Sequence, residues 1–429
     1  MPTRQSQNST PTTADVLIIG AGPAGLSMAC ALADVGIRSC VLEAAPLDSL
    51  ADPAEDGREI ALTQHGMAIL KSLGQWDEIP TEEKAPLRQA HVFNGQGEAS
   101  AQRFLGFDAR GSGSDLLGQL VANHWLRRVA YQGALRRQNM IEIRAGQRVS
   151  GLSLGEAQAS VTLASGDTLS APLAIAADSR FSATRRAAGI GAQMHDFGRS
   201  VLLCRLKHSQ PNQGIALECF HYGHTLALLP LNGDRSSLVL TIAADQANEM
   251  MAWDEDRFLA WVRTQVDGRL GDLSLAGPRH LYPLVASYAH RFATQRLALV
   301  GDAAVGMHPV TAHGYNFGLY GVELLASILG QAKKLGQDLG EAALLARYAQ
   351  EHRRRTWAIY QGTNAVVRLF TDDRPAAKVL RRGVLQVAQH LPPLKAAITA
   401  QLTGRQPGMG SNLLRQLQQL RAGLTLNRP

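Results

Sequence analysis

The hydrophobic pattern of the chain predicts short buried strands that alternate with helices. Asp15 to Gly20 is an apolar, β-branched run typical of a strand, and the Ala- and Leu-rich run after it predicts a helix to about Gly36. A second strand is predicted from Arg38 to Leu42, directly before Glu43. The order strand, helix, strand is that of a parallel βαβ unit in an α/β protein.

Residues from about 200 to 285 have a different pattern. Apolar and mixed faces alternate, hairpin turns such as Asn232-Gly233 separate them, and no glycine-rich phosphate loop occurs there. This pattern predicts an antiparallel sheet that covers a substrate, so a nicotinamide donor would have no nucleotide-binding domain of its own. The predicted strands are Val201–Leu206, Ile215–His221, Thr225–Pro230 and Ser237–Ala243, and a helix follows near Asp254–Val266.

Another buried strand, far along the chain, ends in a carboxylate. Residues Leu297 to Val300 predict the strand, Gly301 and Asp302 follow it, and a helix begins near Gly314 after a compact loop. A carboxylate there can bind cofactor hydroxyls, and a helix N-terminus offers unpaired N–H groups to developing negative charge. The pattern suits a redox cofactor that becomes anionic when reduced, although a purely structural crossover would share it.

Glycines follow the first predicted strand at the spacing G-x-G-x-x-G. Gly20 permits a tight turn, Gly22 lets the backbone approach a pyrophosphate, and Gly25 lets helix and strand pack closely. Glu43, at the end of the second strand, is placed to accept hydrogen bonds from a ribose diol. Strand, glycines, helix and acid together predict dinucleotide binding, with FAD and NAD both possible ligands.

Single residues elsewhere allow two readings each. Arg58 could pair with a phosphate or lie on the surface, and Gln119 could contact a cofactor or form a turn. Asp178 follows a predicted strand, where it could serve a site or cap a helix. His308 and His313 lie in a Pro- and Gly-containing loop without a nearby third ligand, so no metal site is predicted.

Composition narrows the class of protein. The 429 residues are 45% hydrophobic and 18% charged, which predicts two folded domains, or one large domain with an inserted layer, and little disorder. The net charge of +7 favours anionic partners, but the few Trp and Tyr residues argue against nucleic acid. Four scattered cysteines indicate a reducing compartment, and the polar residues 1–14 and the lack of long apolar runs predict neither secretion nor a membrane span.

Taken together, these motifs resemble the FAD-dependent aromatic hydroxylases of the p-hydroxybenzoate hydroxylase fold, and among them the ubiquinone-biosynthesis hydroxylases (UbiH/UbiF/VisC type). The resemblance runs from Asp15 to about Gly404. The family's D-x-R-x-x-A-L element implies that Arg58 contacts FAD, and a glutamine near the flavin in some relatives corresponds to Gln119. Its glycine-rich and ribose-binding elements are matched by Gly20, Gly22, Gly25 and Glu43.

Two further family elements are matched with departures. In A-D-G-x-x-S-x-x-R, Ser179 stands where glycine is usual, and in the G-D-A-A-H element Val305 replaces the common His. The run VGMHPVTAHGYN resembles most the UbiM branch, which is associated with hydroxylation of demethoxyubiquinol. The residues that match the two elements are Ala177, Asp178, Ser182, Arg185, Gly301, Asp302, Pro309, Gly314 and Asn316.

The resemblance implies an FAD-dependent monooxygenase that hydroxylates a prenylated phenol or quinol through a flavin C4a-hydroperoxide, with O2 and NAD(P)H as co-substrates. Asp302 would bind the ribityl chain, and the backbone from Pro309 through Gly314, Tyr315 and Asn316 would bind the pyrimidine edge of the flavin. No catalytic acid or base is assigned. The alternatives are a hydroxylase of a small soluble phenol, a flavin reductase of a prenylated substrate, and an inactive flavin-binding scaffold of a quinone-making complex.

The implied architecture is an α/β (α+β) protein with three parts. A Rossmann-like FAD-binding domain comprises 15–85, 112–185 and 286–345, and an inserted antiparallel-sheet substrate domain comprises 86–111 and 186–285. Residues 1–14 are expected to be a disordered tail, and 346–429 a helical region rich in Leu, Val, Arg and Lys. That basic region could bind an anionic membrane surface, the body of the protein or another subunit. We therefore expect a cytoplasmic protein that is either free or peripheral on the inner face of the cytoplasmic membrane.

Overall fold

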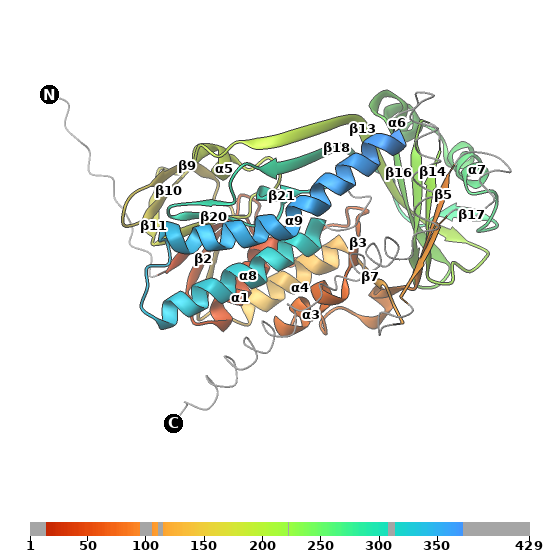
Figure 1. Ribbon diagram of the computed structural model, residues 1–429. Coiled ribbons are helices and arrows are strands. Elements are labelled where there is room, and N and C mark those ends of the chain that lie inside the picture. Colours follow the sequence, from red (N-terminus) through yellow and green to blue (C-terminus); the bar gives the residue numbers. More distant parts are fainter. Residues whose placement is uncertain (1–13, 95–104, 110–114, 222, 308–313, 372–429) are drawn as a thin grey trace.

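The computed structural model describes residues 14–94, 105–109, 115–221, 223–307 and 314–371. Two sheets dominate it. Figure 1 shows one sheet, covered by long helices, on the left and a larger sheet on the right. The predicted Pro309 and the tails 1–13 and 372–429 lie outside the described residues.

A six-stranded sheet forms the left half, in the order β19-β20-β12-β1-β2-β8. All neighbours are parallel except β19 and β20, and the register pairs Val16 with Ser39 on one side and with Leu173 on the other. Such strands are buried on both faces, which explains their continuous apolar runs. The strands are β1 Val16–Ile19, β2 Ser39–Leu42, β8 Ile141–Arg144, β12 Leu173–Ala176, β19 Ala293–Thr294 and β20 Leu297–Leu299.

Long helices cover this sheet. Helix α1 lies against both α4 and α8, and α9 packs against α8 and the β19–β20 edge (Figure 1). Tyr348 on α9 donates a hydrogen bond to the Leu299 carbonyl at 2.7 Å, which ties that helix to β20. The helices are α1 Pro23–Asp34, α4 Asn123–Leu135, α8 Gly314–Lys334 and α9 Ala342–Thr371.

Two small sheets flank the first. One consists of β9 Val149–Leu154, β10 Ala159–Leu163 and β11 Thr168–Ala171, and the other of β3 Glu59–Leu62, β7 Gly118–Ala122 and β4 Ala85–Leu87. The shorter helices near them are α2 Asp48–Ala51, α3 Gln64–Ser72, η1 Thr81–Glu83, α5 Ala183–Ala187 and η3 Gly301–Ala303.

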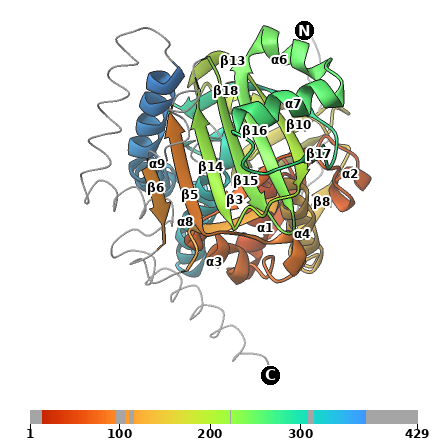
Figure 2. The same cartoon turned by 90° about the vertical axis from the view of Figure 1, so that its right-hand side faces the viewer.

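The right half is a nine-stranded sheet in the order β21-β18-β13-β16-β15-β14-β5-β6, with β17 beside β13. Its outer face is covered by α7, and its other face turns toward the six-stranded half (Figures 1 and 2). The elements are β5 Gln89–Asn94, β6 Leu105–Asp108, β13 Ala192–His208, β14 Ile215–Phe220, β15 Thr225–Leu231, β16 Arg235–Ala243, α6 Ala244–Met251, α7 Glu255–Gln265, β17 Leu273–Leu275, β18 His280–Ala289 and β21 Val305–Gly306.

The sequence-based description of this sheet needs two corrections. The strand expected at Val201–Leu206 lies in the second half of the 17-residue β13, which begins earlier because its more polar first half also pairs with β18. The sheet is also not purely antiparallel, since β14 and β5 run parallel with Glu218 opposite Val92. Strands β5 and β6 therefore share one sheet with β13 to β18, which come much later in the chain.

Candidate active site

The glycine-rich turn after β1 is packed as tightly as the sequence predicts. A Cβ on Gly25 would lie 2.0 Å from the Gly20 carbonyl oxygen, and one on Gly20 would lie 2.6 Å from the Ala177 carbonyl oxygen. Gly20 also has a positive φ of 105°. A Cβ on Gly22, in contrast, would meet no described atom within 4 Å. Gly20 and Gly25 are thus required by the protein's own packing, whereas the space at Gly22 is free for a ligand.

The first turn of α1 presents an anion-binding end. Gly22 is its N-cap and Pro23 its first residue, and within the described chain no side chain caps it and no acidic residue lies in its first turn. The free N–H groups and the helix dipole therefore point toward the open space at Gly22. A phosphate group suits this position.

Glu43 lies beside the same turn, as predicted. Its carboxylate accepts hydrogen bonds from the Ala21 N–H at 2.7 Å and the Ala45 N–H at 2.9 Å. Each carboxylate oxygen retains a further lone pair, so Glu43 can still accept hydrogen bonds from a ribose diol.

Asp302 reaches this site from the other end of the chain. Strand β20 and strand β1 both pair with β12, so they end at the same sheet edge. Gly301 has a positive φ of 58°, and a Cβ on it would lie 2.9 Å from the Ala24 Cβ in the first turn of α1. The two segments that sequence reasoning placed around one cofactor are in direct contact.

Arg180 is a site residue that sequence reasoning did not assign. Its guanidinium donates to the Asp302 carboxylate at 3.0 Å and to the Val285 carbonyl at 2.8 Å. It therefore links the cofactor-side aspartate to β18 of the larger sheet. Its position two residues after Asp178, within a recognised motif, was the available signal.

The loop after β12 holds Arg180 in place. Asp178 accepts hydrogen bonds from the Ser182 hydroxyl and the Thr184 N–H, and the buried Arg185 donates to the Ala303 and Arg180 carbonyls at 2.9 and 3.0 Å. Burial lowers the pKa of Arg185. Ser179 has a φ of 71°, so the serine adopts the left-handed conformation for which glycine is usual.

Arg58 lies at the start of β3 and is about half exposed, with 48% of its side chain accessible. It pairs with the Asp56 carboxylate, which also accepts from the Asn123 side chain at 2.7 Å. Burial raises the pKa of Asp56, but the hydrogen bonds from Arg58 and Asn123 outweigh it and lower that pKa overall. A contact between Arg58 and a cofactor stays a prediction.

The position of Gln119 gives more support to a ligand contact than that of Arg58 does. It lies on β7 opposite Leu62, and its side-chain oxygen is buried without a hydrogen-bond partner among the described residues. A buried amide oxygen left unpaired carries a desolvation cost. The orphaned oxygen is what a site built for an absent hydrogen-bond donor would show.

Asn316, at the start of α8, uses its side chain within the protein. Its amide oxygen accepts from the Thr63 N–H at 3.0 Å, and its amide nitrogen donates to the Ala61 carbonyl at 2.8 Å. Thr63 in turn shares a 2.6 Å hydrogen bond with the Tyr320 hydroxyl. The network holds β3, and through it the β7 strand that carries Gln119, against α8.

The remaining predicted flavin residues are only partly placed. Gly314 begins α8, and the Tyr315 side chain lies beside Ser27 of α1, where burial raises the pKa of its hydroxyl. The predicted flavin contact of this segment therefore concerns its backbone, and Pro309, His308 and His313 lie outside the described residues. Over the part of the chain that is described, no group of three or more His, Cys, Asp or Glu side chains could hold a metal ion.

The glycine-rich turn after β1 and the Gly301–Asp302 segment after β20 together define a dinucleotide-binding class of protein. The edge of the six-stranded sheet at which they meet faces the nine-stranded sheet. The family model described as "FAD binding domain" matches residues 13–363. The chain belongs to this family of FAD-binding proteins.

Individual relatives agree with that assignment. The chain is 45% identical over 390 residues to ubiquinone hydroxylase UbiM of Neisseria meningitidis, which covers 91% of this chain and 84% of the relative. It is 35% identical over 382 residues to ubiquinone hydroxylase UbiL of Rhodospirillum rubrum, covering 89% and 87%. The fold is also that of p-nitrophenol 4-monooxygenase PnpA from Pseudomonas putida, with a TM-score of 0.74, 19% identity, and 92% and 100% coverage.

FAD fits the residues that are present. A bound cofactor would supply what three features of the site lack. It would bring an acceptor for the N–H groups at the uncapped N-terminus of α1, an occupant for the space at Gly22, and a hydrogen-bond donor for the unpaired Gln119 oxygen. Glu43 and Asp302 stand on either side of that turn with acceptor capacity left.

Proposed function

We propose that this protein is an FAD-dependent monooxygenase that hydroxylates the aromatic ring of a prenylated phenol or quinol in ubiquinone biosynthesis, at the demethoxyubiquinol stage. The observation that carries the proposal is the contact of Gly301 with the first turn of α1 at the edge that faces the larger sheet. The similarity to two ubiquinone hydroxylases supports the choice of substrate.

Each cofactor-side residue has a role in this proposal. The N-terminus of α1 at Gly22 holds the pyrophosphate, Glu43 the adenosine ribose, and Asp302 the ribityl chain, and the Gln119 amide oxygen accepts a hydrogen bond at the flavin side. Arg180 screens the negative charge of Asp302. Bound FAD would supply electron transfer and oxygen activation, and the protein orients the ring and excludes water.

The substrate side is an apolar sheet face. Val201, Leu203 and Leu284 form a buried cluster on that face, against which Val239 and Tyr282 pack. Apolar surface of this kind suits an aromatic ring with a hydrocarbon tail and keeps water from the reacting atoms.

The decisive experiment follows oxygen. The FAD-loaded protein is incubated with NAD(P)H, demethoxyubiquinol carrying a short prenyl tail, and 18O2. We expect one 18O atom in the hydroxylated product. Reduction of the substrate without 18O would instead establish the reductase alternative, and hydroxylation of a tail-less phenol at equal kcat/KM would establish the soluble-phenol alternative.

Complementation separates the enzyme from an inactive scaffold. The gene is expressed in a strain that lacks its own demethoxyubiquinol hydroxylase, and the quinones are analysed. Restored ubiquinone supports the proposal. An FAD-loaded protein that neither consumes reduced nicotinamide nor restores ubiquinone would favour the scaffold.

The same proposal includes how the parts of the chain are used. Residues 15–85, 112–185 and 286–345 bind FAD, 86–111 and 186–285 bind substrate, and the basic 346–429 region holds the protein to the inner membrane face or to other quinone-making enzymes, close to the lipophilic substrate. No described helix is long and apolar enough to cross a membrane. Flotation with anionic and neutral vesicles tests the surface attachment, and neutral vesicles should retain less protein.

A further inference from the structure

One row of side chains crosses the larger sheet on the face that turns toward the six-stranded half. The register aligns Leu203 of β13, Val239 of β16, Ala227 of β15, Glu218 of β14 and Val92 of β5. Partners in register point to the same side of a sheet. On β18 the row continues with His280, opposite Leu203, and Glu218 is its acidic member among the apolar residues of the other strands.

Contacts to the FAD-binding half identify this face. Arg205 lies two residues beyond Leu203 on β13, and its guanidinium donates to the Glu59 carboxylate of β3 at 2.9 Å. Tyr282, opposite Val201 on β18, donates to the Asp56 carbonyl at 2.8 Å. Because side chains two apart on a strand share a face, Glu218 projects into the space between the two halves.

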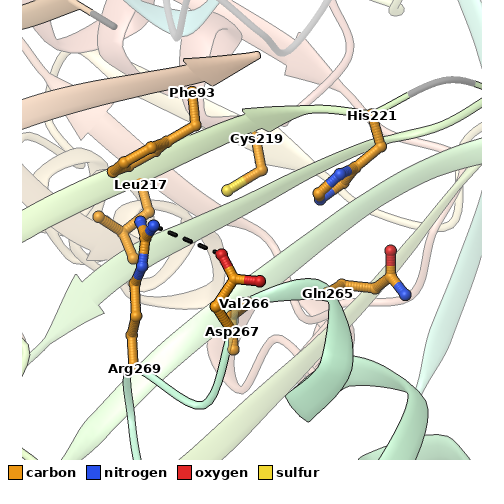
Figure 3. Close-up of a pocket in the computed structure, with 8 residues that line it drawn as sticks. All are labelled: Phe93, Leu217, Cys219, His221, Gln265, Val266, Asp267 and Arg269. Carbon is orange, nitrogen blue, oxygen red and sulfur yellow. Dashed lines mark hydrogen bonds and ion pairs between the residues drawn. The ribbon is translucent and has the colours of Figure 1, made fainter. Parts of the chain in front are cut away.

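The residues on either side of Glu218 face the opposite way. Leu217 and Cys219 belong to the cluster packed under α7, and Figure 3 shows them beside Phe93 and the Asp267–Arg269 ion pair. That recess has an empty volume of only about 220 Å³ including open solvent, and it lies behind the sheet. It is therefore distinct from the inter-sheet space in which the substrate is proposed to lie.

The Glu218 carboxyl has no stabilising partner among the described residues. Burial alone raises its pKa to about 8, and no charged group contributes to the shift. The charged or titratable groups that alternation places on the same face are Arg199, Arg205 and Lys207 of β13, Arg235 of β16, and His280 and Tyr282 of β18. Asp56 and Glu59 face these strands from the other half. The Glu218 residue itself is partly exposed, so its carboxylate is accessible to a hydrogen-bond donor that comes from outside the protein.

We propose that Glu218 binds the ring hydroxyl of the substrate and accepts its proton during hydroxylation. The inference rests on the proposed function, which supplies the aromatic substrate and the oxidant. The ring hydroxyl donates to the carboxylate. The neighbours in register with Glu218, Ala227 of β15 and Val92 of β5, carry no side-chain hydrogen-bond donor.

The protons, electrons and oxygen atoms of the proposed hydroxylation balance. The O–H bond breaks toward Glu218, and the electron pair left on oxygen raises the electron density of the ring carbon that forms the new C–O bond. One oxygen atom of O2 forms the new C–O bond. The other oxygen atom leaves as water, reduced by the two electrons of NAD(P)H. The ring then loses its proton to solvent as it regains aromaticity, and Glu218 returns the first proton to the original oxygen.

Binding of a matched pair of probes tests the contact without turnover. Binding of 2-geranylphenol and of its methyl ether is measured anaerobically by the flavin absorbance of the FAD-loaded protein, at pH 6 and pH 9. At pH 9 the ionised Glu218 carboxylate accepts a hydrogen bond from the phenol. We therefore expect wild type to bind the phenol about tenfold more tightly than the ether, the difference expected for roughly one charge-assisted hydrogen bond. The preference should shrink at pH 6 and disappear in Glu218→Gln.

The pH profile tests the proton transfer. With the demethoxyubiquinol substrate, kcat/KM of wild type should rise up to about pH 8. Glu218→Gln should lose that rise and about 10²-fold in kcat/KM, as expected for a general base, while Glu218→Asp restores part of both. Glu142→Gln, in an exposed ion pair, should behave as wild type.

The outcomes are separable. Retention of both the rise and the phenol preference in Glu218→Gln overturns the inference even if wild type hydroxylates the quinol. If wild type prefers the phenol through Glu218 but incorporates no oxygen, the proposed function fails and the binding contact stands. FAD content and Tm verify folding, and removing a buried charge should leave Tm at pH 9 no lower than that of wild type.

Discussion

The two sides of the proposed active site are built in opposite ways. On the proposed FAD side, backbone atoms approach so closely that Gly20 and Gly25 leave no room for a Cβ, and the proposed ligand contacts are N–H groups and two carboxylates. On the proposed substrate side, the sheet presents side chains such as Leu203, Val239 and Glu218. In the proposed function, main-chain geometry therefore fixes the cofactor on one side, and side chains set specificity on the other.

The largest expected effect separates two glycines of the same turn. In Gly25→Ala the new Cβ would lie 2.0 Å from the Gly20 carbonyl oxygen, so β1 and α1 must move apart. We expect a loss of about 3 kcal/mol or more in unfolding free energy, at the upper end for overpacking, and no FAD retention. Urea unfolding of the apoprotein and the FAD-to-protein absorbance ratio measure the two effects.

Gly22→Ala is the matched control. Its Cβ would meet no described protein atom within 4 Å, so the apoprotein should unfold as wild type does. If the open space belongs to the pyrophosphate, FAD affinity should still fall by about tenfold or more, which is about 1.4 kcal/mol. Wild-type affinity in this variant would mean that the space at Gly22 is not the phosphate site.

The next largest effect concerns the junction of the two halves. Burial raises the pKa of Glu59 to about 7 despite its ion pair with Arg205, and only 2% of the Glu59 side chain is exposed. Arg205→Met leaves this carboxylate unpaired, so we expect a loss of about 3 kcal/mol near pH 7.5, as for other broken buried pairs. Arg144→Met, in an exposed pair with Glu142, should cost less than about 1 kcal/mol.

The raised pKa of Glu59 also predicts how the unfolding free energy changes with pH. Because the folded-state pKa of Glu59 lies above its ordinary 4.5, the folded protein binds more protons between about pH 4.5 and 7. Its contribution to stability is therefore fully present below 4.5 and is lost as pH rises through 7. Glu59→Gln should flatten that part of the curve of unfolding free energy against pH, and an unchanged slope would contradict the shift.

A third prediction addresses the clamp between α8 and β3. Asn316→Ala leaves the Thr63 N–H and the Ala61 carbonyl without their side-chain partner, so we expect a loss of about 2 kcal/mol in unfolding free energy. Asn232→Ala removes an exposed hydrogen bond to the Glu82 carbonyl and should cost about 0.5 kcal/mol. Equal losses in the two variants would show that the Asn316 hydrogen bonds stabilise the protein no more than an exposed hydrogen bond does.

The cofactor-side elements were predictable because their signals are local. The strand expected at Asp15–Gly20 is β1, Glu43 accepts a hydrogen bond from the Ala21 N–H in the glycine-rich turn, and Gly301 lies against Ala24 in the first turn of α1. Parallel strands of one sheet end at one edge, so a motif at each strand end is enough to bring distant residues together.

The substrate side was less predictable because it depends on register. Alternation along β14 indicates that Glu218 and Cys219 face opposite ways, but it cannot tell which face meets the FAD-binding half. The parallel pairing of β14 with β5 and the contact of Arg180 with Asp302 join residues more than 100 positions apart. Such pairings leave no periodic trace in a single sequence.

The smallest predicted effect tests a conformation that sequence left open, at Ser179. This exposed serine adopts a φ of 71°, which costs a residue with a Cβ about 1 kcal/mol relative to glycine. Ser179→Gly should therefore raise the unfolding free energy by up to about that amount, less the entropy that glycine adds to the unfolded chain. Ser153→Gly, at an exposed strand position without positive φ, should lower it by about 0.5–1 kcal/mol. Because the two substitutions are chemically identical, opposite signs in parallel urea titrations would isolate the backbone conformation as the cause, and a loss of stability in both variants would refute the strain at Ser179.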